Sequence, residues 1–140
     1  MSISRHSTEY PSNSKKKWVL IAEDEVISTH ILASYLDEMG YPYRVASDGQ
    51  AAFTYLQHYP NQFFVVLADR IMPKMHGLTL LQKMRATKTL AQIPLILLTG
   101  EANQEEHYAA LRQGVYEFIY KPISKELLMA LLKKIQKSVK

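Results

Sequence analysis

Short apolar runs alternate with segments that suit helices along this chain. The runs occupy residues 18–22, 41–46, 63–68, 94–98 and 115–120. A short continuous apolar run bounded by polar or turn-forming residues is typical of a strand buried on both faces of a sheet. The pattern therefore predicts five strands, each followed by a segment that can cross over to the next strand.

Helices are expected over residues 27–39, 49–58, 77–87, 102–113 and 124–139. Asp48 and Ser124 suit helix N-caps, while Gly40 and Gly114 suit the ends of helices. Strict alternation of strand and helix predicts a parallel sheet, because right-handed crossovers of this length leave few other arrangements. We expect an α/β fold, namely a flavodoxin-like five-stranded parallel sheet of order 2-1-3-4-5 with helices on both faces.

The composition is that of one globular domain. The chain has 140 residues, of which 47% are hydrophobic and 21% are charged. It has no cysteine, which excludes thiol catalysis and disulfide bonds. No apolar run approaches the roughly 20 residues of a membrane-spanning helix, and the N-terminus has no signal-peptide block. A cytoplasmic protein is expected.

The net charge of +4 comes from the two ends of the chain. Residues 1–17 hold four basic residues and one acidic residue, whereas residues 18–132 hold nine basic and twelve acidic residues. We interpret residues 1–17 as a disordered basic leader and residues 18–140 as the folded domain. Nucleic-acid binding through the basic ends is an alternative, although the domain itself has no basic recognition element.

Chemically reactive side chains stand at the ends of the predicted strands. Glu23, Asp24 and Glu25 follow the first strand, Asp69 follows the third, and Thr99 and Lys121 follow the fourth and fifth. The carboxyl ends of parallel strands lie along one edge of the sheet, where such folds place their ligand crevice. So many acids at one edge would repel one another without a cation, and Mg²⁺ suits carboxylate oxygens. Taken alone, residues 23–25 also suit the acidic start of a helix.

Asp69 is the strongest candidate for a reactive group. It ends the most apolar run and precedes Met72 and Pro73, which predict a loop. A carboxylate beside a metal can attack a phosphoryl group and form an acyl phosphate. The Lys121 ammonium can then pair with the phosphoryl oxygens, and the Thr99 hydroxyl can donate a hydrogen bond to them.

Four motifs in order resemble the receiver domain of two-component response regulators, a chemotaxis-regulator-like fold. They are VLIAEDE at 19–25, DRIMPKMHG at 69–77, LLTG at 97–100 and FIYKP at 118–122. The resemblance covers residues 18–138, and four motifs at matching spacings are specific where any one alone is weak.

The resemblance implies a role for each site residue. Asp69 would be the phosphoryl acceptor, Asp24 a direct Mg²⁺ ligand and Glu23 a ligand through water. The Ile71 backbone carbonyl would complete the metal ligands. Thr99 and Lys121 would bind the phosphoryl oxygens, with Thr99 also acting in the switch. Phe118 would be the aromatic residue that changes rotamer, and a cis peptide bond would join Lys121 to Pro122.

The expected function is that of a single-domain response regulator. Its partners would be a histidine kinase or histidine phosphotransfer protein and a downstream effector protein, with no DNA-binding domain and no membrane span. We expect no enzyme activity beyond assistance to its own phosphorylation and dephosphorylation. The sequence leaves open whether phosphorylation drives dimerisation. The alternative is a receiver-like interaction scaffold that is never phosphorylated.

Two segments depart from the family pattern. His76 stands where the family usually has Asp, and residues 115–117 read VYE where small and acidic residues are usual.

Two positions bear on phosphate lifetime. Ile71 and Glu101 lie two residues beyond Asp69 and Thr99, where side chains can screen water, so the apolar Ile71 is expected to slow hydrolysis. The five histidines lack zinc-site spacing and are interpreted as surface or packing residues.

Overall fold

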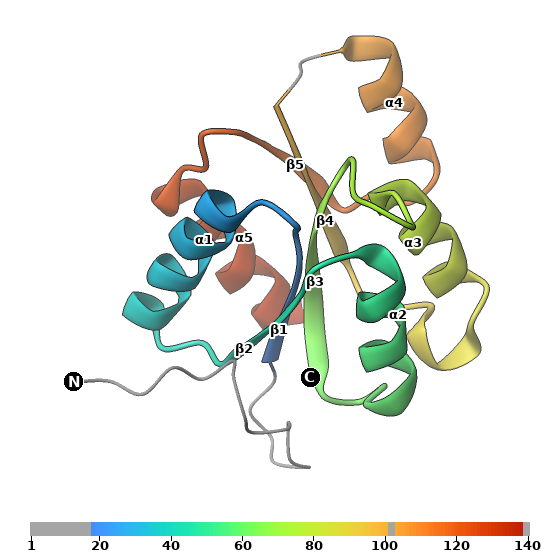
Figure 1. Cartoon of the computed structure of the whole chain (residues 1–140), viewed down its shortest axis with the longest axis horizontal. Coiled ribbons are helices and arrows are strands. Elements are labelled where there is room, and N and C mark those ends of the chain that lie inside the picture. Colours follow the sequence, from blue (N-terminus) through green and yellow to red (C-terminus); the bar gives the residue numbers. More distant parts are fainter. Residues whose placement is uncertain (1–17, 101–102, 139–140) are drawn as a thin grey trace.

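A computed structural model describes residues 18–100 and 103–138 of the chain. The leader predicted over residues 1–17 and the position Glu101 lie outside the described residues. The elements, shown in Figure 1, are β1 (Trp18–Ala22), α1 (Val26–Met39), β2 (Tyr43–Ala46), α2 (Gly49–His58), β3 (Phe63–Asp69), α3 (Gly77–Arg85), the 3₁₀ helix η1 (Lys88–Leu90), β4 (Leu95–Thr99), α4 (Gln104–Arg112), β5 (Glu117–Tyr120) and α5 (Lys125–Ser138).

The five strands form one parallel sheet of order β2-β1-β3-β4-β5. The predicted fold class and strand order are therefore confirmed. β3 lies at the centre, and all of its residues except the last are buried, as expected for a strand covered on both faces. Its last residue, Asp69, pairs with Leu98 and reaches the carboxyl edge of the sheet.

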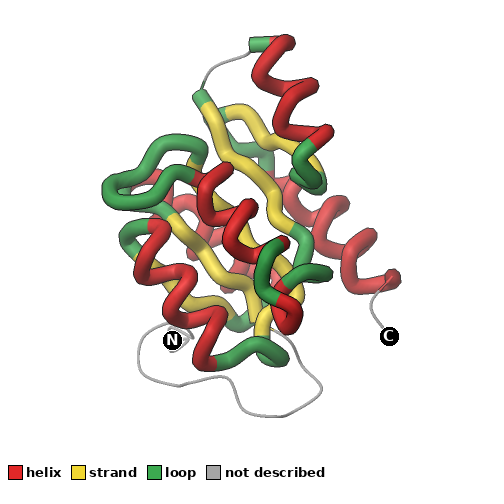
Figure 2. Tube along the Cα trace, turned by 90° about the vertical axis from the view of Figure 1, so that its right-hand side faces the viewer, coloured by secondary structure: helices red, strands yellow, loops and turns green. Residues whose placement is uncertain are grey.

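Helices cover both faces of the sheet (Figures 1 and 2). Alternate residues of β1 point to opposite faces, so that Leu20 packs in the core with α2, α3 and α4, and Ile21 packs in the core with α1 and α5. Side chains of α5 such as Leu132 fill the second core, and side chains of α3 such as Leu81 fill the first. Both cores anchor the strands whose ends carry the polar residues.

Helix caps agree with the sequence. The Asp48 side chain accepts a hydrogen bond from the Ala51 backbone N–H at 2.8 Å, and Ser124 accepts one from Leu127 at 3.1 Å. Gly40, with φ of 82°, follows α1 in the left-handed conformation that glycine adopts at low cost. These local interactions fix where the crossovers leave the sheet.

Several boundaries differ from those predicted. β2 begins at Tyr43 rather than residue 41, because Pro42 has no N–H for the sheet; its carbonyl accepts from Val19 at 2.9 Å. β5 begins at Glu117 rather than residue 115, since the Val115 N–H bonds to the Ala110 carbonyl at the end of α4. β3 and β4 each run one residue further than expected, and α3 ends earlier and is followed by η1, which was not predicted.

None of the helices in the described part of the chain is both long enough and apolar enough to cross a membrane.

Gly77 allows the start of α3 to lie against the carboxyl end of β3. A Cβ at this position would lie 2.6 Å from the Asp69 carbonyl oxygen and 2.7 Å from Leu97 Cδ1. The Gly77 N–H also bonds to the Arg70 carbonyl at 3.1 Å. Close approach, rather than backbone conformation, therefore requires glycine here.

We predict that Gly77→Ala lowers the free energy of unfolding by about 1–3 kcal/mol, because the added methyl group forces backbone atoms apart. Urea denaturation monitored by circular dichroism measures the change. Gly100→Ala is the control, since a Cβ there meets no atom within 4 Å. Equal stability of the two variants would show that the approach of α3 to β3 is not tight.

Candidate active site

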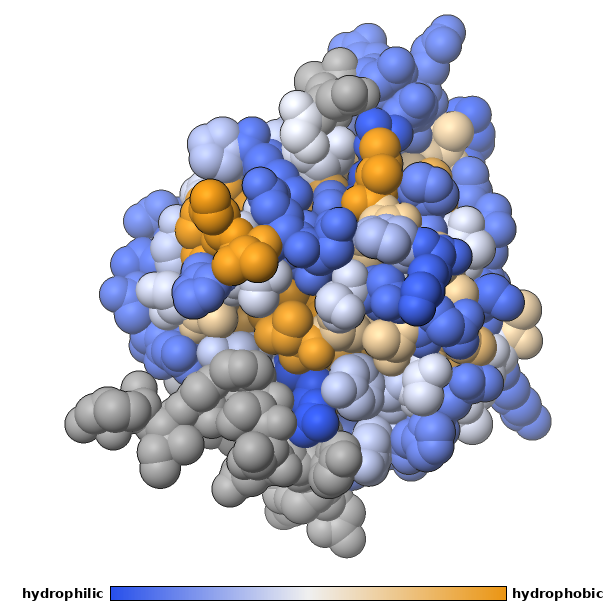
Figure 3. Space-filling view, viewed as in Figure 1, coloured by the Kyte–Doolittle hydropathy of each residue, from blue (hydrophilic) through white to orange (hydrophobic). Residues whose placement is uncertain are grey.

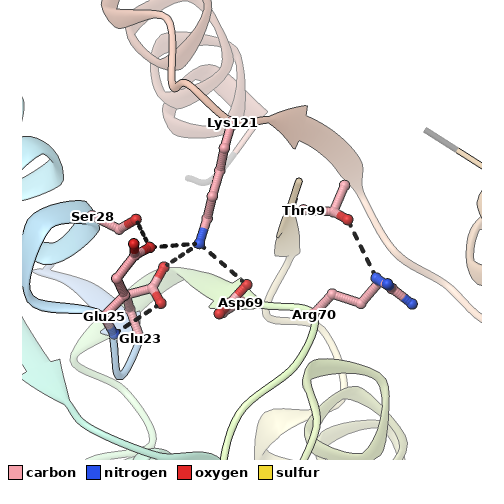
Figure 4. Close-up of polar contacts among 7 residues, drawn as sticks. All are labelled: Glu23, Glu25, Ser28, Asp69, Arg70, Thr99 and Lys121. Carbon is pink, nitrogen blue, oxygen red and sulfur yellow. Dashed lines mark hydrogen bonds and ion pairs between the residues drawn. The ribbon is translucent and has the colours of Figure 1, made fainter. Parts of the chain in front are cut away.

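Polar side chains gather where β1, β3 and β4 end and where the chain leaves β5 (Figure 4). Parallel pairing brings these ends together: the Arg70 N–H bonds to the Leu98 carbonyl at 2.8 Å, and the Lys121 N–H bonds to the Thr99 carbonyl at 2.8 Å. The sheet ladder thus continues past Asp69 and Thr99, and it fixes the backbone from which their side chains project.

Three carboxylates form a compact group at this edge. Glu23, Asp24 and Asp69 each offer one oxygen, and these oxygens all lie within 4.8 Å of one another. Glu23 is buried, Asp69 is half-buried and Asp24 is exposed. The predicted acidic residues therefore meet in space, although β1 and β3 are separated by three elements in the sequence.

The ammonium of Lys121 points into the carboxylates (Figure 4). Its Nζ lies 3.1 Å from Glu23 Oε1, 3.5 Å from Asp69 Oδ1 and 3.5 Å from Glu25 Oε1. Partial burial alone would lower the pKa of Lys121, but Glu23, Asp69 and Glu25 outweigh burial and raise it. Lys121 therefore stays charged and offsets part of the negative charge.

The remaining negative charge affects the pKa of Glu23. Burial, followed by the charge of Asp69, raises the pKa of Glu23 from 4.5 to about 7. Glu23 Oε2 accepts a hydrogen bond from the Glu25 N–H at 3.2 Å, whereas the buried Oε1 faces the Lys121 ammonium at 3.1 Å and accepts no well-directed hydrogen bond among the described residues. An under-satisfied buried oxygen in a set of hard carboxylate ligands fits a small divalent cation such as Mg²⁺.

Thr99 is 3% exposed, and its hydroxyl is tied to Arg70. Arg70 Nε donates to Thr99 Oγ1 at 3.3 Å, and the Arg70 guanidinium forms an ion pair of 2.8 Å with Glu106 of α4. Figure 4 shows Arg70 on the opposite side of Asp69 from Glu25. The residue after Asp69 thus connects the site to α4.

Phe118 is held by side chains of α4 and β5. Its ring stacks on His107 with centroids 3.9 Å apart, and His107 Nδ1 lies in hydrogen-bond contact, 2.8 Å, with the Tyr120 hydroxyl. Phe118 is 8% exposed and borders a cavity of about 260 Å³, which Thr99 also lines. The predicted switch residues Thr99 and Phe118 therefore share one cavity.

The loop after β3 places Ile71 at the surface, with 54% of its area exposed. Lys74 has a φ of 69° in the tight turn that follows. His76 is exposed just before α3 and makes no side-chain cap to that helix. The expected cis peptide bond joins Lys121 and Pro122.

Arg70, His107 and Ser28 contact site residues, yet sequence reasoning gave them no part. The Ser28 hydroxyl donates to Glu25 Oε1 at 2.6 Å. Arg70 lies in a motif next to Asp69, but only the folded structure reveals its hydrogen bond to Thr99 and, through Glu106, its connection to α4. The sequence predicts a surface or packing role for His107, and its ring does pack against Phe118.

Comparison with known proteins matches residues 19–133 to the response regulator receiver domain family. The transcriptional regulatory protein RprY of Bacteroides fragilis is 32% identical over 90% of this chain and 52% of its own length. A probable transcriptional regulator of Porphyra purpurea, ycf29, is 29% identical over 84% of this chain and 55% of its own length. The chain thus spans about half the length of these curated relatives.

Solved structures share the fold. The signal receiver domain of a histidine kinase from Syntrophus aciditrophicus superposes with a TM-score of 0.79, at 28% identity, over 89% of this chain and 92% of that domain. The chemotaxis protein CheY4 of Vibrio cholerae gives 0.78 at 25% identity, over 86% of this chain and 98% of that one. Together with the family match, these likenesses show that the chain belongs to the response regulator receiver domain family of two-component signalling.

Proposed function

We propose that this chain is a response regulator whose Asp69 carboxylate accepts a phosphoryl group from the phosphohistidine of a kinase or phosphotransfer protein. One observation carries the proposal: Asp69 lies at a strand end within reach of two further carboxylates and 3.5 Å from a lysine ammonium. A scaffold that is never phosphorylated would have no use for this arrangement, in which the carboxylates repel one another.

In the transfer, an Asp69 carboxylate oxygen attacks phosphorus while the phosphorus–nitrogen bond of phosphohistidine breaks. The electron pair of that bond leaves with the imidazole, which takes up a proton, and an acyl phosphate forms on Asp69. The Lys121 ammonium lies beside the attacking carboxylate and can neutralise the phosphoryl oxygens. Thr99 can offer its hydroxyl from the neighbouring strand.

Glu23, Asp24, Asp69 and the Ile71 backbone carbonyl would hold Mg²⁺. When bound, the ion supplies charge neutralisation for the phosphoryl oxygens. The under-satisfied Glu23 oxygen and the carboxylate group support this assignment.

The phosphoryl group adds a charge of about −2 beside Thr99 and Lys121. Both residues contact elements beyond the site: Thr99 meets α4 through Arg70 and Glu106, and Lys121 begins the connection to α5. The charge can therefore bias the contacts of α4, β5 and α5, and an effector protein that binds this face would read the change.

Large apolar side chains are exposed in the segments that follow β1 and β3. Val26 and Ile27 at the start of α1 are 69% and 68% exposed, and Ile71 is 54% exposed. On the face seen in Figure 3, hydrophobic residues form separate groups among hydrophilic ones. The exposed apolar side chains of Val26, Ile27 and Ile71, which lie close in the sequence to the acidic residues, support a protein, rather than a free metabolite, as the physiological phosphoryl donor.

Incubation with acetyl phosphate and Mg²⁺ should place one phosphoryl group on the wild-type protein. Intact mass spectrometry should detect the adduct, and Asp69→Asn or chelation of Mg²⁺ with EDTA should abolish it. Asp37→Asn, a carboxylate of α1 that contacts Tyr43 instead, is the matched control and should be modified normally. An adduct that survives Asp69→Asn would refute the assignment of the acceptor.

The exposed Ile71 side chain should protect the acyl phosphate by screening attacking water. We predict that Ile71→Asn shortens the phosphate lifetime several-fold, because an amide can orient water where an alkyl group excludes it. The decay of the adduct after removal of acetyl phosphate measures the lifetime. Ile27→Asn makes the same change on α1 and should leave the lifetime unaltered; equal lifetimes for all three proteins would contradict the screening role.

A further inference from the structure

Glu25 competes with Asp69 for the same ammonium. Its Oε1 lies 3.5 Å from Lys121 Nζ, the same separation as that between Lys121 and Asp69. Glu25 is not among the carboxylates that can hold a metal together, so its acidity has no part in the metal site proposed above. Figure 4 shows Glu25 on the α1 side of Lys121, with Asp69 on the other.

A second contact fixes the Glu25 carboxylate. Ser28, which is only 7% exposed, donates its hydroxyl to the same Oε1 atom at 2.6 Å. One carboxylate oxygen of Glu25 is therefore held between the Ser28 hydroxyl and the Lys121 ammonium. A side chain already held by a short hydrogen bond loses less rotamer freedom on forming an ion pair than a free surface glutamate does.

The contact is not a by-product of helix capping. Glu25 precedes α1, yet its side chain makes no cap to the backbone of that helix. Its Oε1 atom instead contacts the Ser28 hydroxyl and the Lys121 ammonium. The hydrogen bond between the Glu25 N–H and Glu23 involves only the backbone of residue 25 and survives a change of side chain.

We propose that Glu25 is a positioning residue for phosphoryl transfer: held by Ser28, it draws the Lys121 ammonium toward α1 and thereby slows phosphorylation of Asp69. This inference rests on the proposed function. An incoming phosphoryl group needs the ammonium, and each interaction that Lys121 keeps with Glu25 must be weakened before that charge is fully available. The residue would thus set the rate of the reaction without contacting the reacting atoms.

The test compares Glu25→Gln, Glu25→Asp and Ser28→Ala with the wild type. The phosphorylation rate is measured against acetyl phosphate concentration at fixed ionic strength and extrapolated to saturating Mg²⁺, which removes any effect on metal affinity. Glu25→Gln should raise the rate by about twofold to fivefold, the range expected from a partly exposed ion pair. Ser28→Ala should give a smaller rise, because the carboxylate keeps its charge but loses its anchor.

Glu25→Asp separates positioning from simple charge. Its carboxylate is retained but is one methylene too short to reach Ser28 and Lys121 together, so this variant should, like Ser28→Ala, react faster than the wild type and more slowly than Glu25→Gln. Wild-type behaviour of Glu25→Asp, or an unchanged rate in Glu25→Gln, would overturn the proposal. Glu38→Gln is the matched control with no expected effect. Glu38 forms an ion pair of 3.0 Å with Lys125 rather than with Lys121.

A measurement on the unphosphorylated protein keeps this proposal distinct from the proposed function. NMR relaxation of the Lys121 ammonium should show greater mobility in Glu25→Gln than in the wild type and no change in Glu38→Gln. If the wild type takes up no phosphoryl group, the proposed function fails, and the ammonium mobility alone still decides whether Glu25 holds Lys121. Unaltered mobility would overturn the positioning role.

Discussion

One lysine ammonium faces three carboxylates at the edge of this sheet, and the proposed chemistry of the chain depends on that imbalance. Lys121 lies within 3.5 Å of Glu23, Glu25 and Asp69, so a single positive charge serves three acids. The backbone tolerates the arrangement because β1 and β3 are fixed by two packed cores. In the proposed function, the excess negative charge attracts a cation, and the cation together with Lys121 would let a phosphoryl group approach a carboxylate that would otherwise repel it.

The sequence predicts the convergence of the site residues because that convergence follows from topology alone. Once β1, β3 and β4 are parallel neighbours, Glu23, Asp69 and Thr99 must lie along one edge, whatever their rotamers. Caps such as Asp48 and Ser124 are predicted for a similar reason, since each depends on a few adjacent residues. Only side chains whose position the backbone dictates can be inferred in this way.

Contacts between side chains distant in the sequence escape such reasoning. Nothing periodic links Arg70 to Glu106, His107 to Phe118 or Glu25 to Lys121, because each pair depends on rotamers chosen in the folded state. The start of β2 differs from the prediction for another reason. Tyr41 is apolar and favours a strand, but Pro42 has no N–H to donate, so the strand begins only at Tyr43.

Two consecutive residues of α4 contact residues of the site through different kinds of interaction. Glu106 forms an ion pair with Arg70, but Glu106 is largely exposed, and pairs of this kind contribute about 0–1 kcal/mol. His107 stacks on the buried Phe118, a contact of about 0.5–1.5 kcal/mol beyond the area it buries. Salt weakens the first interaction and hardly affects the second. The stack of His107 on Phe118 is therefore the stronger of the two contacts that hold α4. The ion pair between Arg70 and Glu106 would respond more to new charge on Asp69.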